Sequence, residues 1–120
     1  MVAALGRVVV LGPSETDPAA ALIGRLLTDA GAEVAVTPSS EAAALSVEEE
    51  GVAVVVVTDG TLDLVAGLRS SASRKQRSVA VVVVLDTEHE ADEALRSGAD
   101  SVLIRPVEAD RLVETVTRLV

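Results

Sequence analysis

Four acidic residues lie just after apolar stretches of the chain. Glu15 and Asp17 follow the first stretch, Asp59 the third and Asp86 the fourth. Carboxylate oxygens are the ligands that Mg²⁺ prefers, and carboxylates with a divalent ion can position a phosphoryl group and offset its charge. One interpretation is therefore a Mg²⁺ site of Glu15, Asp17 and Asp59, in which Asp59 accepts a phosphoryl group.

The same residues also have simple structural uses. Asp17 precedes Pro18 and can cap a helix, Asp59 can cap another helix beside Gly60, and Glu15 can be a solvated loop residue. We favour this second interpretation and expect no catalytic residue, no metal and no cofactor. If a metal does bind, Glu15 and Asp59 are the candidate ligands.

Arg105 is the basic residue that accompanies these carboxylates, after the fifth apolar stretch and before Pro106. It can pair with Asp59 or Asp86, so that an internal ion pair closes the crevice. The single histidine, His89, has no cysteine or second histidine with which to bind zinc or activate a nucleophile. No glycine-rich phosphate loop is present, so a small ligand in the crevice is an alternative only.

Composition excludes several classes of function. The 120 residues contain no Cys, Phe, Tyr or Trp, and the net charge is −9. Without aromatic rings the chain cannot stack on nucleobases or flavins, and its negative charge repels nucleic acid and anionic lipid. No apolar run approaches the roughly 20 residues of a membrane span. We expect one cytoplasmic domain over residues 1–120, with no direct contact to nucleic acid or membrane.

Short β-branched segments alternate with helical patterns, and these elements must position the polar residues. Strands are predicted at residues 8–11, 33–36, 52–57, 79–85 and 101–104. Several are apolar at consecutive positions, which is typical of a parallel sheet covered on both faces. Five strands, each followed by a helix, predict a flavodoxin-like α/β three-layer sandwich with strand order 2-1-3-4-5 and a crevice at the carboxyl ends of the first and third strands.

Local signals mark where the helices begin and end. The first runs from Asp17 and Pro18 to Gly31, and the second opens at Ser39 or Ser40. The third opens at Asp59 or Thr61, the fourth begins with a capping box of Thr87 and Glu90 and ends at Gly98, and the fifth follows Pro106. Residues 69–78, basic and serine-rich, are predicted to be a flexible loop, with an acidic docking partner as the alternative.

Two stretches of the chain resemble a known family. Residues 93–106, EALRSGADSVLIRP, match the segment EAL-x-x-GAD-x-x-L-x-KP of response-regulator receiver domains at almost every position. Residues 7–37 are also similar to a receiver opening. The resemblance implies a bacterial two-component signalling domain with a CheY-like fold, and a cis bond between Arg105 and Pro106.

The positions that carry the family's phosphorylation chemistry differ here. The acidic pair after the first strand is replaced by Gly12-Pro13 or Pro13-Ser14, the acceptor position falls on Thr58 with Asp59 one residue later, and the lysine is Arg105. The Thr or Ser after the fourth strand has become Leu85 or Asp86. The resemblance therefore indicates an atypical receiver, or pseudo-receiver. The alternative hypothesis is a conventional receiver domain that is phosphorylated at Asp59 with the help of Mg²⁺. Such domains act through a protein partner or a homodimer, commonly over the face of the fourth helix, fifth strand and fifth helix, here residues 94–120.

Overall fold

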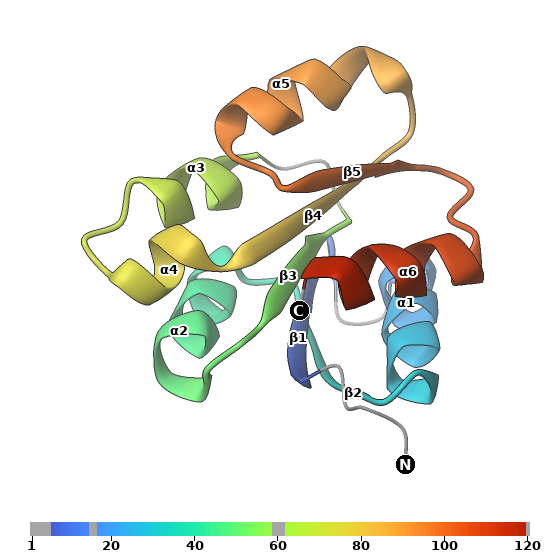
Figure 1. Ribbon diagram of the computed structural model, residues 1–120, viewed down its shortest axis with the longest axis horizontal. Coiled ribbons are helices and arrows are strands. Elements are labelled where there is room, and N and C mark those ends of the chain that lie inside the picture. Colours follow the sequence, from blue (N-terminus) through green and yellow to red (C-terminus); the bar gives the residue numbers. More distant parts are fainter. Residues whose placement is uncertain (1–5, 15–16, 59–61, 120) are drawn as a thin grey trace.

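A computed structural model describes residues 6–14, 17–58 and 62–119 of the chain (Figure 1). Along the sequence the elements are β1 (Gly6–Leu11), α1 (Pro18–Asp29), β2 (Ala32–Thr37), α2 (Ser40–Glu50), β3 (Val54–Val57), α3 (Asp63–Arg69), α4 (Arg74–Ser78), β4 (Ala80–Leu85), a 3₁₀ turn (Glu88–Glu90), α5 (Ala91–Ser97), β5 (Ser101–Ile104) and α6 (Ala109–Leu119).

The five strands form one parallel sheet in the order β2-β1-β3-β4-β5. This confirms the flavodoxin-like topology expected from the alternation of strands and helices. The carboxyl ends of all five strands lie at the same edge, so the segments that follow β1, β3, β4 and β5 meet there.

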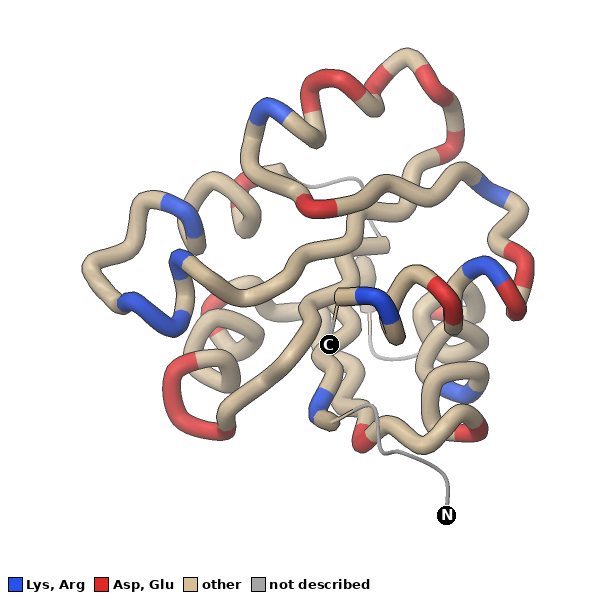
Figure 2. The backbone as a smooth tube through the Cα atoms, in the orientation of Figure 1, with Lys and Arg blue, Asp and Glu red and all other residues tan. Residues whose placement is uncertain are grey.

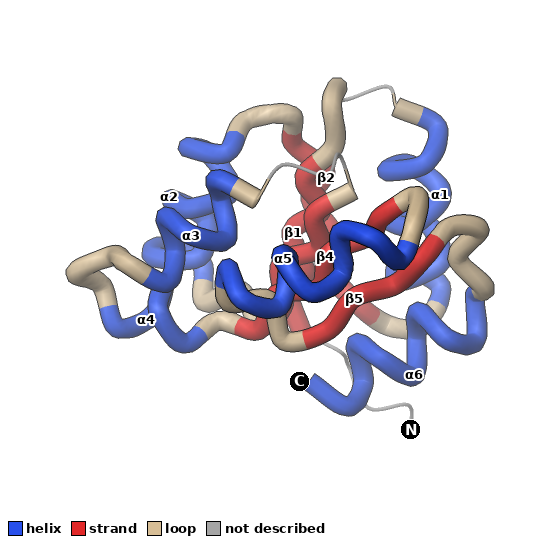
Figure 3. The backbone as a smooth tube through the Cα atoms, turned by 90° about the horizontal axis from the view of Figure 1, so that it is seen from above, coloured by secondary structure: helices blue, strands red, loops and turns tan. Residues whose placement is uncertain are grey.

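Two apolar layers flank the sheet, because successive side chains of each strand point to opposite faces. In β3, Val55 and Val57 pack with α2, α3 and α5, while Val54 and Val56 pack with α1 and α6. Figure 3 shows α2 and α3 on one side of the sheet and α1 and α6 on the other. All four valines are fully buried, which explains why the strand is apolar at every position.

The predicted helix starts hold for α1 and α2. The Asp17 side chain accepts a hydrogen bond from the Ala20 N–H, and Ser39 caps α2 by accepting from the Ala42 N–H. The predicted starts of the third helix, Asp59 and Thr61, lie outside the described residues. In the structure α3 begins at Asp63, after Leu62.

Two local predictions were wrong. Residues 69–78 are not one flexible loop, because residues 74–78 form α4, whose first turn Ser73 caps and whose Gln76 amide donates to the Ala44 carbonyl. Thr87 makes no capping hydrogen bond: residues 88–90 form a 3₁₀ turn, and α5 begins only after it. A capping box needs α-helical backbone over that first turn.

Among the described residues, no helix is both long enough and apolar enough to cross a bilayer.

Candidate functional site

An open pocket of about 390 Å³ lies at the carboxyl ends of the strands. It gathers four of the residues singled out in the sequence: Asp17, Thr58, Asp86 and Arg105. Pro13, Val84, Leu85 and Glu90 complete its lining. The other two candidates, Glu15 and Asp59, lie outside the described residues.

Thr58 directs its side chain into the protein. It is 1% exposed, and its hydroxyl donates to the Leu11 carbonyl at 2.9 Å while its N–H donates to the same oxygen at 2.8 Å. Gly12 leaves room for this arrangement, since a Cβ at that position would lie 2.8 Å from the Ala20 Cβ and 3.4 Å from the Thr58 hydroxyl. The position expected for a phosphoryl acceptor therefore holds a hydroxyl that is used to join β1 and β3.

Asp17 serves as the amino-terminal cap of α1. Its Oδ2 accepts the Ala20 N–H at 3.0 Å, which satisfies one of the backbone donors left open at the start of a helix. The predicted helix-capping role of Asp17 is therefore confirmed, and one of its carboxylate oxygens is bonded to the backbone.

Arg105 extends across the pocket from the end of β5. The bond to Pro106 is cis, as the family resemblance implies, and the Arg105 N–H donates to the Leu85 carbonyl at 2.8 Å. Its guanidinium donates to the Thr58 carbonyl, and Nε lies 3.3 Å from the Asp86 carboxylate without hydrogen-bond geometry. One cation thus links the ends of β3, β4 and β5.

The ion pair with Asp86 is the weaker of these contacts. The Asp86 side chain is 86% exposed and the Arg105 side chain 34%, so water screens the attraction. Exposed pairs contribute about 0–1 kcal/mol. The hydrogen bond to the Thr58 carbonyl, made by a charged donor in a partly buried position, is therefore the contact that fixes Arg105.

The described residues do not fit a Mg²⁺ site. In the part of the chain that the structure describes, no three His, Asp or Glu side chains come close enough together to hold a metal ion. The pocket's carboxylates, Asp17, Asp86 and Glu90, are accompanied by the Arg105 cation, which repels a second cation. His89 is exposed in the 3₁₀ turn.

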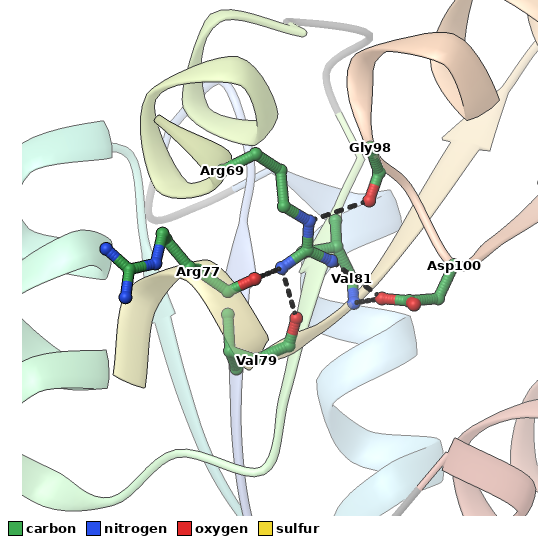
Figure 4. Close-up of polar contacts among 6 residues, drawn as sticks. All are labelled: Arg69, Arg77, Val79, Val81, Gly98 and Asp100. Carbon is green, nitrogen blue, oxygen red and sulfur yellow. Dashed lines mark hydrogen bonds and ion pairs between the residues drawn. The ribbon is translucent and has the colours of Figure 1, made fainter. Parts of the chain in front are cut away.

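A second polar cluster lies at the opposite end of the strands, where sequence reasoning had placed Arg69 only in a predicted basic loop. Arg69, at the end of α3, contacts the turn into β4 and the turn into β5, including Asp100 (Figure 4). Asp100 belongs to the GAD motif, but the partner 31 residues away could not be matched to it without the fold.

The face made by α5, β5 and α6 corresponds to the face named from the family resemblance, because α4 adds one helix to the count. Leu95 on α5 is 48% exposed, and Val102 and Ile104 of β5 are half-buried. An apolar groove of about 440 Å³ lies beside this face, lined by α1 and by the segment 105–107.

Comparisons with known proteins agree with the fold. The family model for the response regulator receiver domain matches residues 15–117. No curated protein sequence matched the chain. A receiver domain of a sensor histidine kinase from Pseudomonas aeruginosa PAO1, solved with a magnesium ion in its active site cleft, is 17% identical, with a TM-score of 0.78 and 98% of each chain covered.

Two further solved structures are similar to the same extent. A response regulator receiver domain from Bermanella marisrubri is 23% identical, with a TM-score of 0.78 and 98% of each chain covered. Chemotaxis protein CheY4 from Vibrio cholerae is 17% identical, with a TM-score of 0.78 over 98% of this chain and 100% of that one. At these identities the structures establish the fold, and the family model establishes the family.

Proposed function

Because the chain belongs to the response regulator receiver domain family, we propose that it is a pseudo-receiver, a two-component signalling domain that binds a protein partner without being phosphorylated. Residues 1–120 form its single domain in this proposal, and it acts in the bacterial cytoplasm. Receiver domains interact with other proteins, and in this chain phosphorylation would not control that interaction.

The observation that carries the proposal is the state of Thr58. A phosphoryl acceptor must present a nucleophilic oxygen to the crevice, whereas this hydroxyl is buried and donates to the Leu11 carbonyl. Gly12 and Pro13 supply no carboxylate beside it. The described part of the crevice therefore lacks both the acceptor and the acidic pair.

Arg105 supports the same proposal. Its guanidinium already supplies a positive charge between the Thr58 carbonyl and Asp86, where a phosphorylatable domain needs a metal ion and a free lysine. A chelator cannot remove this covalently attached cation, whereas it can remove a bound metal ion. The side chains of the crevice would then keep one conformation, and the Arg105 contacts would serve to support the fold.

The docking surface in this proposal is the α5, β5 and α6 face. It offers one exposed leucine, Leu95, beside the half-buried Val102 and Ile104 of an edge strand. Apolar side chains surrounded by polar ones are typical of a binding surface. A protein partner or a second copy of the chain is the proposed occupant, and neither Mg²⁺ nor any other cofactor is needed.

The proposal is tested by asking whether the domain forms an acyl phosphate or its mimic. The purified chain is incubated with Mg²⁺ and either acetyl phosphate, followed by intact mass spectrometry, or beryllofluoride, followed by ¹⁹F NMR. We expect no adduct and no bound fluoride resonance. A phosphorylatable receiver domain treated in parallel provides the positive control.

The matched variant is Asp59→Asn. If the unmodified chain forms an adduct that Asp59→Asn does not form, Asp59 is a working acceptor and the domain is a conventional switch. An adduct formed equally by both chains would lie at a residue other than Asp59, and it would also contradict a domain that is not phosphorylated.

A further inference from the structure

Arg69 is the centre of a polar cluster at the amino-terminal ends of β4 and β5 (Figure 4). Its Nε donates to the Gly98 carbonyl at 2.9 Å, and one terminal nitrogen donates to the Arg77 and Val79 carbonyls at 2.8 and 2.7 Å. The other terminal nitrogen donates to the Asp100 carboxylate at 2.8 Å. A guanidinium has five N–H donors, so this single side chain is almost fully used.

Asp100 is itself fixed to β4 by two further hydrogen bonds. Its Oδ2 accepts the Val81 N–H at 2.8 Å, and its own N–H donates to the Val81 carbonyl at 2.8 Å. The Arg69 side chain is 22% exposed. The charge-assisted bonds are therefore shielded in part from water and contribute more than an exposed surface pair does.

Besides the Arg69 bonds, only small apolar side chains among the described residues hold α5 on the sheet, namely Ala94 and the partly buried Ala91. This helix is seven residues long, Ala94 is its one buried residue, and no side chain caps its amino terminus. A helix this short is marginal without tertiary contacts. Its carboxyl end, where Gly98 takes a left-handed conformation with φ 117°, is where Arg69 binds.

The four bonds divide into two groups. Those to the Arg77 and Val79 carbonyls keep the guanidinium on the α4 and β4 side, while those to Gly98 and Asp100 hold the segment that joins α5 to β5. If the second group breaks, the carboxyl end of α5 loses its bond to α3, while Asp100 stays bonded to Val81 and Arg69 stays anchored to the Arg77 and Val79 carbonyls. One side chain therefore connects α4 and β4 to the segment that joins α5 to β5.

We propose that Arg69 is a latch that sets the position of α5, and with it the docking face of α5, β5 and α6, from the end of the sheet opposite the crevice. The inference rests on the proposed function, because that face is the proposed docking surface. It adds that the face is controlled by the Arg69 cluster: when the latch opens, α5 detaches, Ala94 leaves its buried place on the sheet, and the exposed Leu95 moves with the helix.

Hydrogen–deuterium exchange of the full chain tests the latch, with Arg69→Met compared with Arg77→Met. Arg77 takes part in the cluster only through its carbonyl, and its side chain contacts the Ser71 and Ala72 carbonyls, so this control removes an equal charge from the same region. In Arg69→Met we expect exchange over residues 91–100 to be roughly tenfold to a hundredfold faster. Exchange in α1 and β1 should not change.

A chemical probe gives an independent measurement. The chain has no cysteine, so Ala94→Cys places a single thiol at a fully buried position of α5. We expect the thiol to react slowly with a disulfide reagent when Arg69 is present and at least several-fold faster when Arg69→Met is added. Arg69→Lys, which keeps the charge but not the fork of donors, should fall between the two.

Two results would overturn the latch. One is exchange over residues 91–100 that is the same in Arg69→Met and Arg77→Met. The other is acceleration spread evenly over the chain, in which case Arg69 supports the whole fold and α5 has no separate motion. If Arg69→Met does not fold, Arg69→Lys decides between these outcomes. A phosphoryl adduct at Asp59 would contradict the pseudo-receiver proposal and leave these exchange results unaffected.

Discussion

Thr58 donates both its backbone N–H and its hydroxyl to one acceptor, the Leu11 carbonyl. The hydroxyl therefore duplicates a contact that the backbone already makes. This redundancy separates a structural threonine from a catalytic one, because a catalytic hydroxyl would be directed toward the pocket. The consequence can be measured as a stability change.

Replacing Thr58 by valine should lower the free energy of unfolding only slightly. Valine has nearly the same shape, and the Leu11 carbonyl keeps the Thr58 N–H as a donor, so no buried polar group is left unpaired. We expect a loss of about 0.5–1 kcal/mol in urea unfolding, the lower part of the range for a hydrogen bond. Thr58→Ala should lose more, about 1–3 kcal/mol, because it also opens a cavity.

A loss above about 2 kcal/mol in Thr58→Val would contradict this account of the residue. It would mean that the hydroxyl has a further partner in the crevice, and that the side chain is available to it. The unchanged slope of the urea transition would serve as the control that the denatured state is the same.

The helix α2 carries three glutamates, Glu48, Glu49 and Glu50, at its carboxyl end, where the helix dipole disfavours negative charge. The sequence offered no reason for them. In the structure α4 packs beside this end, and the Lys75 ammonium donates to the Glu48 carbonyl at 3.2 Å. Arg7 lies near Glu50, at 3.7 Å. The Glu49 side chain makes no ion pair or hydrogen bond with the residues that the structure describes.

Two isosteric substitutions at opposite ends of α2 should therefore change the free energy of unfolding in opposite directions. Glu49→Gln removes a charge from the unfavourable end and should stabilise the protein by a few tenths to about 1 kcal/mol, whereas Glu41→Gln removes one from the favourable first turn and should destabilise it by a similar amount. Both side chains are exposed, so packing is unchanged. Thermal and urea unfolding at low ionic strength measure the difference; equal effects at both ends would show that the dipole does not decide.

The sequence predicts an element well when residues within that element mark its ends, and poorly when distant contacts hold it. α1 was predicted almost to the residue because Asp17, Pro18 and Gly31 mark its ends. α4 was missed because distant contacts hold it, among them the bond from Gln76 to the Ala44 carbonyl. In the crevice, strand ends placed Thr58, Asp86 and Arg105 together, whereas the cluster around Arg69 joins segments that only the fold brings near one another.

Over the whole molecule, charge is divided unevenly (Figure 2). Acidic residues gather on the 3₁₀ turn and α5, at Glu88, Glu90, Asp92 and Glu93, while α4 carries Arg74, Lys75 and Arg77. The net charge is −9 in a body with a radius of gyration of 12.8 Å. At 10 mM ionic strength the screening length is about 30 Å, so the charges interact across the whole fold and the excess of acidic residues produces a net repulsion.

Adding NaCl should therefore stabilise the protein. Between 10 and 150 mM the screening length falls to about 8 Å, shorter than most distances across the fold, so the net repulsion is screened while the partly shielded Arg69–Asp100 pair keeps most of its attraction. We expect the free energy of unfolding to rise by an amount on the order of 1 kcal/mol and then level off. Calorimetry across this salt range measures it, with sodium sulfate at equal ionic strength as the control for excluded-salt effects. A fall in stability would mean that the local ion pairs outweigh the net charge, and that the Arg69 and Arg105 contacts contribute more to the fold than their exposure indicates.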